Sequence, residues 1–475
     1  MGVHTIIYGV GSVAQTLGAF LLIPLLTSFL NPEQYGAFSL IQMVGTIAAA
    51  IFYLGVTSAL PRSYFDHNEP DRKKQIFSAT LLVLLLGALC QISLGHFFSP
   101  AISQWFFEGP IYSREIFWSL AASALVFLNQ GFYSLLRLER KSSHFVLFSF
   151  INLALLFPVV YYLLKFQQMG LLAPFAGIFI VQGLQLVFFF ALYCRNHLTL
   201  KLKAEDVKVL IEFGTPIILA NFAMMSVDWF DRIILEKYHT LADVGVYSLG
   251  YRLGSMINAL FVTPFTQIWN PMMMEYRTHE NFKMFSSKIL SYYLLIGLAI
   301  CFGGLSFSRD LFPLFARSSG YGEAEPVAWV ILYSYFFYGL CNIVVAGLFF
   351  ARKTMKLALI TYVAAILNIL LNLLWIPQYG TWGATTSTAI SYAIIPLMIY
   401  FFGSKYFRFE FELNKIFKIF AINSLFVAVL LGPFSESSLL FRIALFLIYT
   451  AAIYRFALDK GERTTLKRLG RDLSS

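Results

Sequence analysis

The feature that most constrains this chain is a series of apolar runs, each about 20 residues long or longer, that recur along nearly its whole length. An α-helix needs about 20 largely apolar residues to cross the hydrocarbon core of a bilayer. Transmembrane β-strands instead alternate apolar and polar residues over about ten positions, which these runs do not. Charged residues are also scarce, at 13% of the chain against about 25% in soluble domains. The sequence therefore predicts an all-α polytopic membrane protein.

The runs predict about 14 transmembrane helices joined by short connections, with no segment left for a soluble domain. The first run lacks a basic n-region and a convincing cleavage site, so we expect it to be retained as a helix. The expected spans are 5–30, 36–60, 75–98, 115–136, 144–165, 171–194, 209–236, 243–268, 284–307, 326–351, 356–376, 381–403, 415–432 and 438–457.

The basic residues predict the orientation of these spans. Of the 35 Lys and Arg residues, 27 fall in the loops on one side or in the C-terminal tail. Basic loops mark the cytoplasmic side, so both termini are expected in the cytoplasm. The same asymmetry explains the net charge of +10 without a nucleic-acid partner. Five basic residues lie on the opposite side: Arg114, Lys165, Lys237, Arg309 and Arg317.

A short motif indicates an internal duplication. Tyr35-Gly36 opens the second span, and Val244-Gly245 opens the eighth span 209 residues later, each after a short polar turn. Two more pairs have nearly the same spacing, namely Lys141 with Lys353 and Gly170 with Gly380. Six spans separate the copies, so the repeats are expected to be parallel. We therefore expect two parallel six-helix bundles, 1–200 and 201–404, followed by two extra helices and a basic tail in 405–475.

The chain carries no catalytic or nucleotide-binding signature. It has no GxSxG, no HExxH and no glycine-rich loop ending in GK[ST]. The seven histidines lie mostly in loops or at span ends, and no cysteine pair has CxxC spacing. We expect a transporter rather than an enzyme, without a cofactor or metal, although coupling to H+ or Na+ is compatible with the sequence.

Ionisable residues within the spans are the strongest candidates for function, because a charge in hydrocarbon costs several kcal/mol. Arg252 lies about ten residues, or roughly 15 Å, into its span. Facing a hydrated cleft, its guanidinium would suit an anionic group such as a diphosphate. The alternative is a structural ion pair with Asp228 or Asp231 that holds the seventh and eighth spans together.

Three further charges lie in the seventh span, and one ends the second. Asp228 and Arg232 are four residues apart, so they share a helix face and are candidates for an internal ion pair. Otherwise Asp228 or Asp231 would bind or release a coupling cation. Asp231 is nearer the outer surface, where a solvated side chain is an alternative. Arg62 ends the second span, either as a contact for an entering lipid phosphate or as a cytoplasmic anchor.

The segment SFLNPEQYGAFSLIQMVGTIAAAIFYLGVTSALPRSYFD resembles the N-terminal signature of polysaccharide biosynthesis membrane proteins. These are the lipid-linked oligosaccharide flippases of the multidrug/oligosaccharidyl-lipid/polysaccharide exporter superfamily. In the second half, FGTPIILANF, DRIIL, VGVYSLGYRLGSM and PFTQIWNPMMMEY are similar to the same family. The resemblance extends to about residue 400, and fourteen helices are expected of such members.

The resemblance implies transport of an undecaprenyl-diphosphate-linked oligosaccharide across the bacterial inner membrane, for O-antigen, capsule or exopolysaccharide synthesis. It implies alternating access, with basic cavity residues, here Arg62, Arg232 and Arg252, holding the diphosphate or sugar. Membrane lipids, a polysaccharide polymerase and chain-length proteins would be partners.

Two other functions compete with a flippase. A cation-coupled drug or metabolite antiporter of the same superfamily would carry a carboxylate deep in the first bundle, and the first six spans contain none. A membrane-embedded polymerase or acyltransferase would carry a large outer loop or a catalytic histidine, and neither is present.

Overall fold

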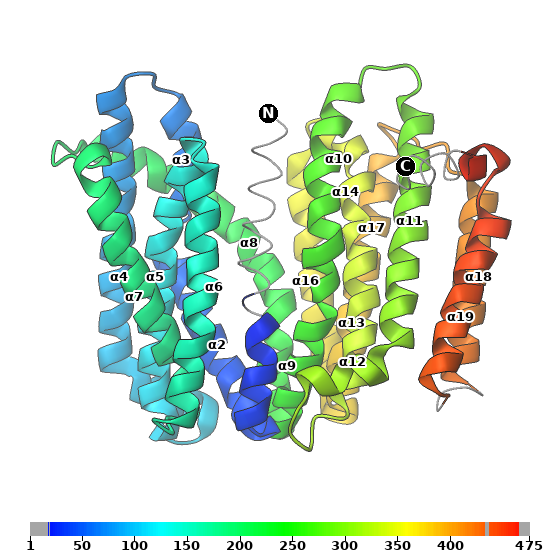
Figure 1. The fold of residues 1–475 in the computed structure, drawn as a ribbon. Helices are drawn as coiled ribbons and strands as arrows, with labels where there is room; N and C mark the ends of the chain where they lie inside the picture. The colour runs from blue at the N-terminus through cyan, green and yellow to red at the C-terminus, as the bar shows by residue number, and fades with distance from the viewer. Residues whose placement is uncertain (1–17, 19, 433–436, 465–475) are drawn as a thin grey trace. The chain divides into compact units, whose positions relative to one another are not determined.

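The computed structural model describes residues 18, 20–432 and 437–464, in which helices are joined by turns and loops and there is no β-strand (Figure 1). Among the described residues, eleven helical segments are long and apolar enough to cross a membrane. The predicted fold class, an all-α multi-pass membrane protein, is therefore confirmed. The eleven segments are Pro32–Phe65, Pro70–Phe107, Pro110–Leu138, Ser142–Lys165, Leu172–His197, Phe282–Ser306, Ala324–Phe350, Thr354–Tyr379, Thr381–Gly403, Leu413–Leu431 and Leu439–Ala457.

Each of these segments coincides with one predicted span, and the three remaining spans have identifiable reasons to differ. The span 5–30 lies mostly outside the described residues, which include a short apolar helix over Phe20–Phe29. The span 209–236 is helix α8 (Ala204–Tyr238), which carries charges within its apolar run. The span 243–268 is interrupted: α9 (Leu241–Gly254) is followed by a π-helical turn, η2 (Asn258–Val262), and then by α10 (Thr263–Tyr276).

The predicted second span is also divided. Helix α2 (Pro32–Phe52) begins at an Asn31 capping box, in which Asn31 Oδ1 accepts from the Gln34 N–H and Gln34 Oε1 accepts from the Asn31 N–H. It ends before Leu54 and Gly55, which both have left-handed backbone conformations. Helix α3 (Val56–Phe65) then continues to the end of the predicted span and carries Arg62.

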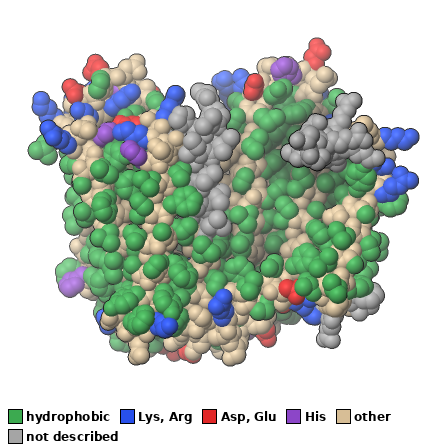
Figure 2. Space-filling view, viewed as in Figure 1, with side chains coloured by type: hydrophobic (Ala, Val, Ile, Leu, Met, Phe, Trp, Pro, Cys, Tyr) green, Lys and Arg blue, Asp and Glu red, His purple; other side chains and the backbone are tan. Residues whose placement is uncertain are grey.

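The helices group into two compact units. The first comprises Met1–Leu249, Ala316–Ala324 and Ala365–Ala384, and the second comprises Gly250–Phe315, Glu325–Ala364 and Thr385–Ser475. On the face shown in Figure 2, hydrophobic side chains cover the middle of the helices of each unit, and Lys and Arg gather toward helix ends. The boundaries 1–200, 201–404 and 405–475, which follow from the sequence repeat, remain a prediction.

The first unit is built around α5 (Ser113–Leu138), which packs against α2, α4 (Pro70–Phe107) and α7 (Leu172–His197). Phe132 of α5 stacks on Phe189 of α7, with 5.1 Å between ring centroids. Helix α6 (Ser142–Lys165) closes this group against α7. Polar side chains inside the unit bond across helices: Gln91 Nε2 of α4 donates to the Leu120 carbonyl of α5 at 3.0 Å.

Two close approaches in the first unit depend on glycine. Gly36 of α2 faces Gly245 of α9, and a Cβ at either position would overlap a backbone carbonyl of the other helix. These are the glycines of the repeated motif, so the two copies of the motif pack on each other. Gly55 is likewise in contact with Gly214, which brings α3 against α8.

The second unit places its core around Tyr293 and Phe302 of α11 (Phe282–Ser306). Tyr293 stacks on Phe336 of α13 (Ala324–Gly339) at 5.2 Å between ring centroids. Phe302 contacts Tyr449 of α19 (Leu439–Ala452) at 4.5 Å, so α19 and α18 (Leu413–Leu431) lie against α11. The rest of the unit consists of the last turn of α9, η2, α10, α12 (Ser308–Phe315), α14 (Cys341–Val344), α15 (Ala346–Phe350), η3 (Ile453–Ala457), the first part of α16 (Thr354–Tyr379) and most of α17 (Thr381–Gly403).

We expect Gly36→Val to lower the melting temperature and the yield of monodisperse protein, because the added side chain must push α2 away from the backbone of α9. Overpacking of this kind costs about 1–3 kcal/mol or more. Gly322→Ala is the matched control, because nothing lies within 4 Å of its added Cβ. Fluorescence-detected size exclusion of heated samples measures both. A Gly36→Val protein as stable as the control would show that the approach of α2 and α9 is not required.

Candidate functional site

Three of the five predicted site residues lie together on α8 in the first unit, and two of them form a buried ion pair. Arg232 Nη1 lies 3.3 Å from Asp231 Oδ1. Asp231 is completely buried and Arg232 is 4% exposed. The alternative of a solvated Asp231 is therefore wrong: its position near the end of α8 faces the neighbouring helix rather than water.

Helix α9 supplies the remaining partners of this pair. The Tyr247 hydroxyl donates to Asp231 Oδ2, and Arg232 Nε donates to Ser248 Oγ at 3.1 Å. The Arg232 guanidinium also lies over the ring of Trp229, 4.7 Å from its centroid. Both charges are thus compensated within the protein, which a buried ion pair requires. The arrangement joins α8 to α9.

Asp228 lies one turn before Arg232 and is half-buried. Its backbone carbonyl accepts a hydrogen bond from Arg232 Nη1. The carboxylate that forms the ion pair with Arg232 is therefore that of the adjacent residue, Asp231, whereas the i, i+4 pattern favoured Asp228. Adjacent helical residues point about 100° apart, so the pair needs the long arginine side chain to bend back toward Asp231.

Arg252 belongs to the second unit and is half-buried in the last turn of α9. The tyrosine before it, Tyr251, is buried and shares hydroxyl contacts with Tyr335 at 3.1 Å and Tyr392 at 3.2 Å. These three hydroxyls from three helices form a polar centre beside Arg252 in the chain. The sequence analysis did not single them out, because tyrosine is too common in this chain to be a signal.

Arg62 lies on α3 in the first unit and is exposed. Its guanidinium sits over the ring of Phe213 of α8, 4.7 Å from the centroid. At the same end of the unit, Arg72 Nη2 pairs with Asp206 Oδ1 at 2.8 Å. Arg62 therefore presents a charge at a helix end with its planar group held against an aromatic face, a geometry available to a phosphate.

Tyr247 and Ser248 are site residues that the sequence analysis missed, although a signal for them existed. Both belong to the repeated motif Val244-Gly245-Val246-Tyr247-Ser248-Leu249, which was noted only as evidence of duplication. They follow Asp231 and Arg232 by 16 residues, a spacing that a helical hairpin brings together.

We expect Asp231→Asn and Arg232→Met each to destabilise the protein by on the order of 3 kcal/mol, because each leaves its partner buried without a counter-charge. The double change Asp231→Leu with Arg232→Leu should recover much of that loss, because no buried charge remains. Melting temperatures of the purified proteins give the comparison.

The control for this cycle is the exposed pair Lys208 and Glu212 on the same helix, with 3.8 Å between Nζ and Oε1. Replacing either residue by glutamine should leave the melting temperature nearly unchanged, because exposed pairs contribute little. If the loss of stability in the double variant equalled the sum of the losses in the Asp231 and Arg232 single variants, the two residues would not act as a coupled pair.

Comparison of the sequence and the fold with known proteins identifies the family of this chain. Residues 2–277 match the family described as polysaccharide biosynthesis protein. The chain is 23% identical over 263 residues to "Lsg locus putative protein 1" of Haemophilus influenzae. That match covers 54% of this chain and 61% of the relative, so less than two thirds of the relative's length is represented.

Solved structures share the fold. A lipid II flippase, MurJ, in an inward closed conformation has a TM-score of 0.76 at 16% identity, covering 96% of this chain and 99% of that chain. An inward-facing multidrug resistance MATE transporter of the MOP superfamily has a TM-score of 0.66 at 15% identity, covering 82% of this chain and 94% of that chain. The structural likeness covers nearly the whole chain, and the family model covers more than half of it. The protein belongs to the polysaccharide biosynthesis protein family.

Proposed function

We propose that this protein is a flippase for an undecaprenyl-diphosphate-linked oligosaccharide that is destined for O-antigen, capsule or exopolysaccharide. The observation that carries the proposal is the family match over residues 2–277, combined with a fold shared with a lipid II flippase. The polar group of a lipid-linked oligosaccharide cannot cross the hydrocarbon core unaided, because it would lose its hydrogen bonds to water. A bundle of membrane-spanning helices can provide a polar path for it. The protein would act as a transporter and not as an enzyme.

The proposed setting is the bacterial inner membrane, with both termini in the cytoplasm. The cytoplasmic termini are supported by the distribution of basic residues, 27 of 35 of which belong to one set of loops and the tail. A polysaccharide polymerase and chain-length proteins would act on the translocated lipid-linked sugar.

Arg62 and Arg252 are the residues that we propose to hold the diphosphate. A guanidinium suits this role, because its planar donors match phosphate oxygens and its charge does not titrate. Arg62 is exposed at the end of α3, where a lipid headgroup could first meet the protein. Arg252 is half-buried within α9, which keeps part of its side chain accessible.

Arg232 is the weakest of the three predicted substrate ligands. Its partners Asp231 and Ser248, together with its 4% exposure, favour a structural role. Asp228 and Asp231 were proposed as a coupling site or a structural pair. The enclosed contacts of Asp231 favour the structural role, which leaves Asp228 as the candidate for coupling to H+ or Na+ in an alternating-access cycle.

A cation-coupled antiporter is the second candidate, because the fold is also that of multidrug resistance MATE transporters. Deletion of the gene separates the two functions. The flippase predicts loss of surface polysaccharide and accumulation of its undecaprenyl-diphosphate-linked precursor on the cytoplasmic leaflet. Normal polysaccharide together with increased drug sensitivity would reject the flippase and favour the antiporter.

Complementation of the deletion strain tests Arg252. We expect Arg252→Ala to reduce polysaccharide export about tenfold or more, because a charge-assisted contact to the diphosphate is lost. Arg252→Lys should retain part of the activity, since it keeps the charge but not the planar donor fork.

Arg195→Gln is the matched control for Arg252, because it removes an exposed arginine at the end of α7. Export should be unchanged in that strain. Full export by Arg252→Ala at a normal protein level would remove Arg252 from the proposed site.

A further inference from the structure

Arg442 is a charge within a predicted span that the proposed function does not use. It lies one turn into α19 in the second unit, and its side chain is 9% exposed. Its Nη2 pairs with Asp310 Oδ1 at 3.2 Å, and its Nη1 reaches the Ser306 carbonyl only at 3.5 Å. Its Nε is buried and has no hydrogen-bond partner among the described residues. A buried guanidinium with an unused donor calls for another acceptor.

A cavity of about 310 Å³ lies beside this guanidinium. Arg442 and Arg309 both line it, as do Ser308, Glu325 and Trp329. Helices α11, α12, α13, α18 and α19 begin or end at this cavity. The ends of membrane-spanning helices are expected at the level of lipid headgroups. Arg309 is one of only five basic residues on the side predicted to face outward. Two arginines together are unexpected on that side.

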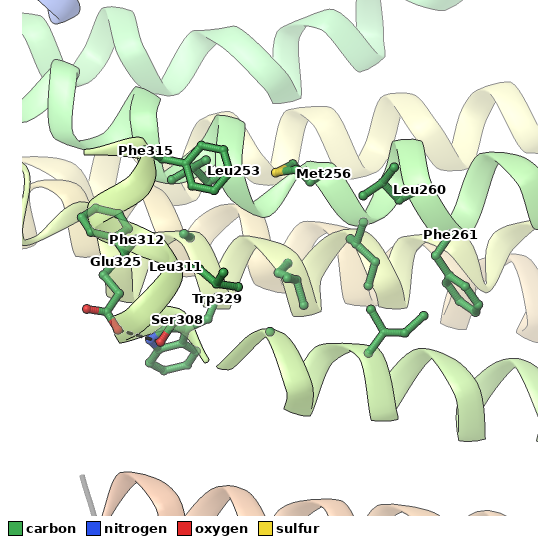
Figure 3. Close-up of a pocket in the computed structure, with 15 residues that line it drawn as sticks. Leu253, Met256, Leu260, Phe261, Ser308, Leu311, Phe312, Phe315, Glu325 and Trp329 are labelled. Atoms are coloured by element: carbon green, nitrogen blue, oxygen red, sulfur yellow. Dashed lines mark hydrogen bonds between the residues drawn. The ribbon is translucent and has the colours of Figure 1, made fainter. Parts of the chain in front are cut away.

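A second, apolar cavity of about 350 Å³ adjoins the first, because Ser308, Glu325 and Trp329 line both. Figure 3 shows its long side: Leu253, Met256, Leu260 and Phe261 follow one another away from the polar end. Phe261 lies eight positions after Leu253, which at the helical rise corresponds to a length of about 12 Å along the apolar cavity. At the polar end, Ser308 Oγ donates to Glu325 Oε1 at 2.6 Å (Figure 3).

The two cavities together have the shape and polarity of an amphiphile. The polar cavity offers arginine donors at headgroup level, and the apolar cavity runs from there toward the interior of the span. We propose that this is a binding site for a membrane phospholipid, with its phosphodiester on Arg442 and Arg309 and one acyl chain along α9 and η2. The proposed substrate ligands Arg62 and Arg252 are not among the residues that line the two cavities.

The charges around the polar cavity favour a phosphodiester over a more highly charged group. Arg309 and Arg442 are matched by Asp310 and Glu325, so an anion must share the guanidinium of Arg442 with Asp310. A phosphodiester adds one negative charge to this balanced set, whereas a more highly charged group adds two or more and meets stronger repulsion from Asp310 and Glu325. Removing the Asp310 charge should therefore strengthen lipid binding.

Native mass spectrometry of the purified full chain in a neutral detergent tests the site. The chain is titrated with dioleoylphosphatidylglycerol, dioleoylphosphatidylethanolamine, dioleoylglycerol, undecaprenyl phosphate and inorganic phosphate. We expect one tightly held phospholipid of either headgroup and no comparable binding of dioleoylglycerol, which lacks the phosphodiester. Inorganic phosphate that binds as tightly as the phospholipids do would overturn the proposal, since the tail would then contribute nothing.

Variants assign the binding to this place. Arg442→Gln should weaken the phospholipid adduct about tenfold or more, and Arg442→Lys should weaken it less. Asp310→Asn should strengthen it, a gain that misfolding cannot mimic. Arg195→Gln is the control and should bind as the wild type does. Met256→Trp should displace the acyl chain by filling the apolar cavity.

Two results would reject the proposal outright. One is phospholipid binding that is the same in the wild type, Arg442→Gln and Asp310→Asn. The other is binding of undecaprenyl phosphate, but not of phospholipids, at a site that depends on Arg442. Neither result bears on the export assay of the proposed function, because that assay measures the substrate and this one measures a retained lipid.

Discussion

A charge on an apolar helix must find its compensation inside the protein, and the first unit depends on this constraint at α8. Asp231 and Arg232 are buried together, and each takes a further partner from α9, Tyr247 and Ser248. Removing one partner of a buried ion pair lowers the stability of the fold by more than the intact pair adds to it. The fold must therefore keep these four side chains together. Their contacts fix how α8 and α9 face each other.

The start of α9 combines this charge compensation with close backbone packing. Gly245 allows α2 to approach, and Tyr247 and Ser248, two and three residues later, reach Asp231 and Arg232. One short motif thus holds three helices of the first unit. Beyond Gly254 the helix loosens into the π-helical turn η2, where cavity-lining residues replace tight contacts. Irregular helical turns of this kind occur frequently at functional sites.

The arginines of the chain differ in how completely they are satisfied. Arg232 has a carboxylate, a hydroxyl and a carbonyl as partners, which suits a structural role. Arg62 rests on an aromatic face at a helix end and keeps its charge exposed. Arg442 is buried, yet its Nε has no acceptor in the described part of the chain. The Nε of Arg442 therefore distinguishes this arginine from Arg232, whose partners form an internal ion pair.

The sequence by itself determined the membrane class and eleven of the spans. The length of an apolar run is a local property of the sequence, and it decides whether a helix can cross the hydrocarbon core of a bilayer. It also identified Asp231 and Arg232, since buried charges are rare enough to stand out. Only the tertiary structure decided that Arg232 pairs with Asp231, because that choice depends on where α9 places Tyr247 and Ser248. The cavity at Arg442 likewise required the fold. Its walls come from 305–309, 325–329, 430–431 and Arg442, positions that no sequence spacing relates.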